Sequence, residues 1–177
     1  MSSKNMDSLL QDAQDGINAQ DVANKFLTFF AHGKLYGLTI ANVNGITQIQ
    51  EITAMPELPH YVKGIINLRG VVVPLVDVNL RFGNEEQEYT DRTCIITLEV
   101  GGNRIGFIVD AVDAVIDIPE ENISPPPPLT SNLSGYVTGV AKTGEGGTRL
   151  VLLLDSFTMV GEVNLVASDI NNMPDVI

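Results

Sequence analysis

The chain has 177 residues and a formal net charge of −12, because 22 Asp and Glu residues outnumber 10 Lys and Arg residues. This balance argues against binding to nucleic acid or to an anionic membrane surface, since both need clustered basic residues. The hydrophobic content of 44% is enough to build a core and excludes global disorder. No stretch reaches the roughly 18 apolar residues of a membrane span, so we expect a cytoplasmic protein.

The first 24 residues are polar, lack the apolar core of a signal peptide and are expected to form a flexible tail. From Lys25 the chain reads as β-structure. The segments KFLTFFA (25–31) and LYGLTI (35–40) are rich in aromatic and β-branched residues and flank a short turn. VVVPLV (71–76), TCIITLEV (93–100), RIGFIVDAV (104–112) and RLVLLLD (149–155) continue the pattern.

Glycine and proline separate these runs at short intervals, which favours a barrel or sandwich and leaves room only for short helical turns. Asp77 and Asp155 are placed to cap one such turn each, through accepted backbone amide hydrogen bonds. SPPPP (124–128) is typical of polyproline II, either as a spacer or as a ligand for an aromatic groove. Residues 161–177 are expected to form a C-terminal tail.

An internal repeat joins the two halves of the chain. A shift of 69 residues aligns Gly33 with Gly102, and YVKGI (61–65) aligns with YVTGV (136–140) at a shift of 75. The alignment shift increases from 69 to 75 because the second half has extra residues in its loops, where insertions are tolerated. We therefore expect an all-β domain over 25–160, made of two five-stranded barrels. Residues 25–84 with a C-terminal contribution would form the first barrel and 85–155 the second, with the boundary near the acidic segment 84–91.

Catalytic and metal-binding patterns are missing from the sequence. His32 and His60 have no Ser or Cys motif nearby, and Cys94 is the only cysteine. We expect a non-enzymatic binding module with no metal and no cofactor. A hydrolase on a double barrel is the weak alternative, opposed by the lack of a nucleophile motif.

The turn in LRGVVV (68–73) suggests where such a module binds. Asn67 and Gly70 suit a tight reversal, from which Arg69 would project. By composition alone a solvated turn charge is the simpler interpretation. Arginine is nonetheless a preferred interface residue because its planar group pairs with carboxylates through two hydrogen bonds.

Three strings, ITQIQEI (46–52), PHYVKGIINLRGVVVPLVDVNLRFG (59–83) and IGFIVDAVDAVIDI (105–118), resemble the CheW family of chemotaxis coupling proteins. The resemblance runs from about Lys25 to Val160. It implies two SH3-like barrels packed on each other and a non-enzymatic adaptor. The adaptor would couple chemoreceptors to the histidine kinase CheA in membrane-associated arrays. A scaffold for a non-flagellar chemosensory pathway is the alternative.

The resemblance also implies two partner surfaces. One would pair with the related regulatory domain of CheA, and a groove between the subdomains would hold the cytoplasmic tip of the receptor. Positions matching the family's partner contacts and the turn that presents them are Ile49, Glu51, Asn67, Arg69 and Gly70, and positions near the receptor groove are Cys94 and Val115. The family's frequent Asp-Leu-Arg is Asp-Val-Asn here, so a basic residue is missing at Asn79.

Overall fold

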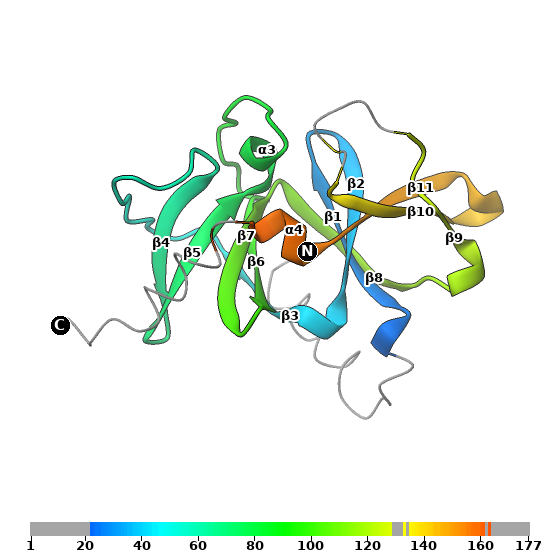
Figure 1. Ribbon diagram of the computed structural model, residues 1–177, viewed down its shortest axis with the longest axis horizontal. Helices are drawn as coiled ribbons and strands as arrows, with labels where there is room; N and C mark the ends of the chain where they lie inside the picture. The colour runs from blue at the N-terminus through cyan, green and yellow to red at the C-terminus, as the bar shows by residue number, and fades with distance from the viewer. Residues whose placement is uncertain (1–21, 129–132, 134, 162, 164–177) are drawn as a thin grey trace.

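The computed structural model describes residues 22–128, 133, 135–161 and 163 (Figure 1). The two expected tails lie almost wholly outside these residues. The strands are β1 (Lys25–Ala31), β2 (Lys34–Thr39), β3 (Val43–Gln48), β4 (Val62–Leu68), β5 (Val71–Asp77), β6 (Cys94–Val100), β7 (Asn103–Val109), β8 (Ala111–Asp117), β9 (Ile123–Ser124), β10 (Val137–Thr143) and β11 (Arg149–Leu154). The helical turns are η1 (Ile40–Asn42), α3 (Val78–Arg81), η2 (Glu120–Asn122), η3 (Glu145–Gly147) and α4 (Ser156–Val160).

These strands form two sheets, which confirms the all-β prediction. The five-stranded sheet has the order β3-β6-β7-β5-β4, and the six-stranded sheet has the order β8-β1-β2-β11-β10-β9. Figure 1 shows the two sheets side by side, with α3 and α4 near the line where they meet. The sixth strand is the two-residue β9, which pairs with β10 at the sheet edge and is followed by the exposed prolines 125–128.

Both sheets curl, because their edge strands are joined by short connections. The chain passes from β8 through η2 directly to β9, at the opposite edge of the six-stranded sheet. In the five-stranded sheet, the chain leaves β3 and forms an isolated bridge between Thr53 and Ile65 of β4. Each curled sheet encloses its own small apolar cluster, with Val151 and Leu153 in one and Val73 and Leu75 in the other.

The internal repeat is visible strand by strand. A shift of 69 moves β1 onto β6 and β2 onto β7, a shift of 75 moves β4 onto β10, and a shift of 78 moves α3 onto α4. Gly37 and Gly106 occupy equivalent places, where β2 runs parallel to β11 and β7 runs parallel to β5. A Cβ added at Gly106 would overlap Leu75 of the neighbouring strand at 2.6 Å, and one added at Gly37 would make a tight contact with Leu153 at 3.0 Å.

The predicted division of the repeats into barrels is wrong at the level of strands. The six-stranded sheet takes residues 25–39 and 111–154, whereas the five-stranded sheet takes residues 43–109. The third strand of each repeat leaves its own first two strands and pairs with the other repeat, so β3 joins β6 and β8 joins β1. The expected boundary at 84–91 therefore lies inside the five-stranded sheet rather than between two domains.

The segment RIGFIVDAV is also not one strand. It breaks at Asp110, where β7 of one sheet ends and β8 of the other begins. The Asp110 backbone N–H donates to the Phe30 carbonyl, and its carboxylate accepts from the His32 backbone N–H and from Asn79 Nδ2. These three hydrogen bonds stabilise the crossing between the sheets. They also give Asn79, which is 4% exposed, a structural partner.

The two predicted caps are confirmed. The Asp77 carboxylate accepts from the Leu80 backbone N–H at 3.2 Å, and the Asp155 carboxylate accepts from Phe157 N–H at 3.2 Å. The main core lies between the sheets and contains Phe29, Phe107 and Met159 at 0% exposure. No helix of the described residues is long and apolar enough to cross a bilayer.

Candidate functional site

The turn between β4 and β5 has only two residues, Arg69 and Gly70, with φ of 54° and 86°. Two positive φ values define the type I′ turn, whose twist matches the flanking strands of a hairpin. The Asn67 side chain closes the turn, because its Oδ1 accepts from the Gly70 N–H at 2.8 Å. Asn67, Arg69 and Gly70 are all exposed, so the sequence prediction of a projecting arginine is correct in its local geometry.

Arg69 occupies a backbone conformation that disfavours every residue with a Cβ except Asn and Asp, at a cost of roughly 1–2 kcal/mol. Within the described part of the chain, its guanidinium has no ion-pair partner that would offset this cost. His32 and Glu57 have similar φ values of 51° and 64°, so Arg69 is distinguished by its exposed guanidinium rather than by the strain alone. The geometry therefore supports a contact outside the chain.

Ile49 and Glu51 follow β3. Ile49 is half-buried and packs on the same apolar cluster as Leu68 and Val71, the two residues next to the turn. Glu51 is exposed. Ile49 is thus linked to the turn through a shared apolar cluster, although Ile49 and Glu51 lie outside the strands.

Cys94 and Val115 belong to a second location, where the sheets meet. Cys94 begins β6 of the five-stranded sheet, and its Sγ accepts a hydrogen bond from the Val112 backbone N–H in β8 of the six-stranded sheet. Cys94 is only 8% exposed, whereas Val112 and Val115 are half-buried against the shared core. We call Cys94, Val112 and Val115 the seam. Val112 was missed from the sequence, although the repeat aligns it with Val43.

The strand register separates the turn from the seam. Cys94 pairs with Gln48 and Val109 at one end of the five-stranded sheet. The Arg69 turn leaves the sheet at the other end, beyond the start of β5. The length of β6, seven residues, places about 20 Å of strand between these ends. Arg69 and Cys94 therefore lie at opposite ends of the sheet, whereas Ile49 directly follows Gln48, the partner of Cys94, and packs in the same apolar cluster as Leu68 and Val71.

Burial changes the acid–base behaviour of several groups without creating a catalytic set. Desolvation raises the pKa of the Cys94 thiol to about 11, which keeps it protonated at neutral pH. Desolvation also raises the pKa of Asp77, although its hydrogen bonds to Leu80 and to the Tyr89 hydroxyl act in the opposite direction. The described residues contain no group of three His, Cys, Asp or Glu side chains that could hold a metal ion.

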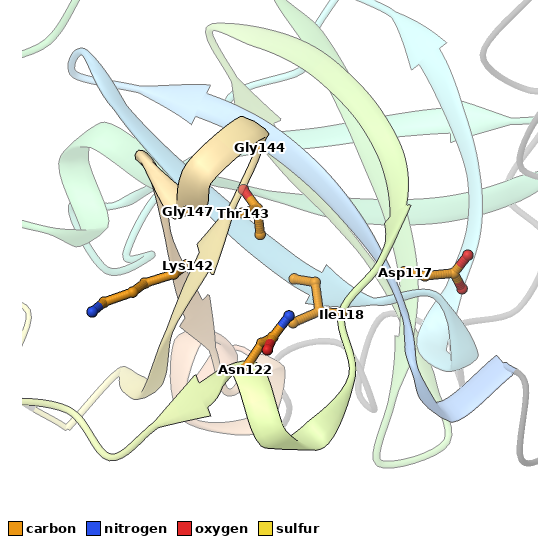
Figure 2. Close-up of a pocket in the computed structure, with 7 residues that line it drawn as sticks. All are labelled: Asp117, Ile118, Asn122, Lys142, Thr143, Gly144 and Gly147. Carbon is orange, nitrogen blue, oxygen red and sulfur yellow. The ribbon is translucent and has the colours of Figure 1, made fainter.

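A cavity of about 390 Å³ lies between the end of β8 and the β10–β11 loop (Figure 2). Its polar side chains are those of Asp117, Asn122, Lys142 and Thr143. Figure 2 shows that the Lys142 and Asp117 side chains point in opposite directions, and Asp117 is paired with Lys25 at 2.8 Å. Its charged groups do not converge on a common point, so the cavity offers no acid–base arrangement.

The sequence analysis did not single out Arg81, whose guanidinium lies between two aromatic rings. Arg81, at the end of α3, lies between the rings of Tyr61 and Tyr136, with its Cζ 4.1 and 4.9 Å from their centroids. Its Nε and Nη2 donate to the carbonyls of Met159 and Thr158 in α4, at 2.7 and 3.1 Å. The two tyrosines are equivalent in the repeat, which was the available signal.

Two β-sheets that share one core, with short helical turns between them, define an all-β domain with an exposed arginine turn. A family model for the CheW-like domain matches residues 25–163. The chemotaxis protein CheW of Klebsiella aerogenes is 33% identical over 77% of this chain and 81% of its own length. The probable chemotaxis protein CheW of Rhizobium etli is 38% identical over 74% of this chain and 83% of its own.

A solved structure agrees with these sequences. The scaffolding protein TtCheW from Thermoanaerobacter tengcongensis superposes with a TM-score of 0.72 at 36% identity, covering 78% of this chain and 93% of that one. The chain belongs to the CheW-like domain family.

Proposed function

We propose that this chain is a chemotaxis adaptor that couples chemoreceptors to the histidine kinase CheA and so regulates kinase activity. Family membership supports the adaptor role, and the observation that carries the coupling is Arg69. An always-charged side chain stands in a strained, exposed turn with no ion-pair partner in the described residues. Its fork of donors suits a carboxylate on a partner.

Two surfaces suit an adaptor, because a coupling protein must hold two partners at once. We assign the turn to the kinase regulatory domain, together with Ile49, which packs in the same apolar cluster as Leu68 and Val71, and the nearby exposed Glu51. We assign the seam to the receptor's cytoplasmic tip, where half-buried Val112 and Val115 offer apolar contact area. Recruitment to membrane-associated receptor arrays would follow from these contacts, and no catalytic activity is part of the proposal.

A scaffold for a chemosensory pathway that does not control flagella is the second candidate. It uses the same two surfaces, so the structure favours neither output. Deletion of the gene, scored for swimming through soft agar and for surface motility, separates the two.

The coupling proposal is tested by reconstitution. Purified chain, a receptor signalling fragment and CheA are mixed, and kinase autophosphorylation is measured with each component omitted in turn. Activation that requires the chain supports the proposal. Full activation by receptor and CheA alone would refute it.

Each surface is tested separately by equilibrium binding. Arg69→Glu should weaken CheA binding and leave the receptor fragment bound, because it places a repelling charge in the turn of an already acidic protein. Val115→Asp should do the reverse. If Arg69→Glu weakens neither partner, the turn is removed from the kinase surface.

A further inference from the structure

We infer that Arg81 is a positioning residue that fixes the two sheets against each other and thereby shapes the seam that binds the receptor. This rests on the proposed function, which supplies the receptor as the seam's partner. The inference rests on the position of Arg81. Its helix, α3, directly follows β5 of the five-stranded sheet, while its side chain contacts Tyr136 and α4, which adjoin β10 and β11 of the six-stranded sheet.

The contacts of Arg81 are divided between the sheets. Tyr61 directly precedes β4 of the five-stranded sheet, and Tyr136 directly precedes β10 of the six-stranded sheet. Both tyrosine carbonyls accept from the backbone N–H of a capping aspartate, Asp77 at 2.8 Å and Asp155 at 2.9 Å. The rings are thus fixed at equivalent places in each repeat. One guanidinium between them joins the repeats through stacking that a flexible ammonium does not reproduce.

The hydrogen bonds of Arg81 act on α4. The carbonyls of Thr158 and Met159 lie in the last turn of α4, where helix geometry leaves acceptors without an internal donor. Gly161 follows with φ of 56°, and a Cβ there would lie 2.7 Å from Arg81 Nη2. The chain therefore leaves room for the guanidinium at this point.

A path of packed atoms connects this clamp to the seam. Met159 and Val160 of α4 are fully buried in the shared core, and α4 lies against β6. β6 begins at Cys94, whose Sγ accepts from Val112 of β8. Loss of the Arg81 contacts would weaken the attachment of α4 to the five-stranded sheet. β6 of that sheet could then move away from β8 of the six-stranded sheet. The internal repeat shows that this role is not shared, because the position equivalent to Arg81 is Met159.

Cys94 provides the measurement, because it is the chain's single cysteine and reports opening of the seam. The purified chain is treated with a thiol reagent such as Ellman's reagent across low urea concentrations. A labelling rate that changes little with urea reports local opening, whereas a steep dependence reports global unfolding. Arg81→Lys keeps the charge, and Arg81→Met keeps the length and copies the repeat-equivalent residue.

Arg81→Lys should label Cys94 about tenfold faster than wild type with a shallow urea dependence, since one lost stacking or charged hydrogen bond corresponds to about that factor. Arg81→Met should label at least as fast, because it removes both ring contacts and both hydrogen bonds. Receptor-fragment affinity should fall by a similar factor while CheA affinity is kept. Arg149→Lys is the matched control, because Arg149 pairs with Asp113 at 2.8 Å within the six-stranded sheet alone. Arg149→Lys should leave the rate of Cys94 labelling at low urea unchanged.

Labelling that stays at the wild-type rate, or that rises only in parallel with global unfolding, would overturn the inference. So would an equal rise in Arg149→Lys. If the wild-type chain bound no receptor fragment, the proposed function and the receptor role of Arg81 would both fail. Cys94 labelling would still decide whether Arg81 holds the sheets together.

Discussion

Arg69→Gly should separate folding from coupling by moving the two in opposite directions. Arg69 has a φ of 54°, where a side chain with a Cβ costs roughly 1–2 kcal/mol. Glycine removes this cost but loses about 0.5–1 kcal/mol of backbone entropy on folding. The difference predicts a free energy of unfolding that is unchanged or about 1 kcal/mol higher. For a chain of this length 1 kcal/mol corresponds to a melting-temperature rise of about 2–4 °C.

The same substitution should weaken the complex. An arginine paired with a carboxylate at the centre of an interface typically contributes about 2 kcal/mol or more, which is roughly 30-fold in affinity. We expect Arg69→Ala to melt within a few degrees of wild type, since alanine meets the same strain, and to lose affinity to the same extent as Arg69→Gly.

His32→Gly is a matched control for this experiment. His32 is the other non-glycine residue in a two-residue hairpin turn, with a φ of 51°, and Gly33 follows it as Gly70 follows Arg69. Its backbone bond to Asp110 survives the change. It should gain the same stability without any loss of coupling.

The assays are thermal melting and CheA binding by titration calorimetry, followed by kinase activation in the reconstituted complex. Normal affinity and activation in Arg69→Gly would refute the contact and leave Arg69 as a solvated charge. A fall in melting temperature would refute the strain argument instead.

Three further outcomes concern the fold. Burial raises the pKa of Asp77, so the folded state binds this proton more tightly than the unfolded state does. The free energy of unfolding should therefore fall as the pH rises above the ordinary value of 3.8 and become flat once Asp77 is ionised in the folded state. Urea titrations at several pH values should show this dependence for wild type and not for Asp77→Asn. With its pKa raised to about 11, Cys94 should react with Ellman's reagent at pH 8 far more slowly than in the unfolded chain; equal rates would contradict its burial. Gly106→Ala should cost about 1–3 kcal/mol and Gly37→Ala less, because the added Cβ lies 2.6 Å from Leu75 in the first case and 3.0 Å from Leu153 in the second; urea midpoints rank them.

The sequence was informative where a local pattern has one structural solution. Apolar runs marked β1, β2, β5, β6, β7 and β11. Asp77 and Asp155 marked the first residues of α3 and α4, because each side chain accepts a hydrogen bond from a backbone amide of the turn. The pair Arg69–Gly70 between two strands fixed a hairpin turn. These features depend on a few neighbouring residues.

The sheet exchange could not be predicted in the same way. A repeat shows which strands are equivalent, but equivalent strands can pair within one copy or between copies with the same side chains. The choice is made at Asp110, where three hydrogen bonds from distant segments turn β7 into β8. The Arg81 contacts depend on that exchange, since α3 and α4 meet only once the repeats have interleaved.

The two-residue β9 and the prolines after it limit how this protein can aggregate. β9 is the outer strand of the six-stranded sheet, and an open sheet edge normally invites further strands from other molecules. Residues 125–128 have no backbone N–H to offer, so a neighbouring chain finds no ladder to extend past Ser124. An adaptor crowded beside many copies of itself and its relatives would be protected at this edge against irreversible strand-to-strand aggregation. Its assembly would then depend on side-chain contacts, which can dissociate.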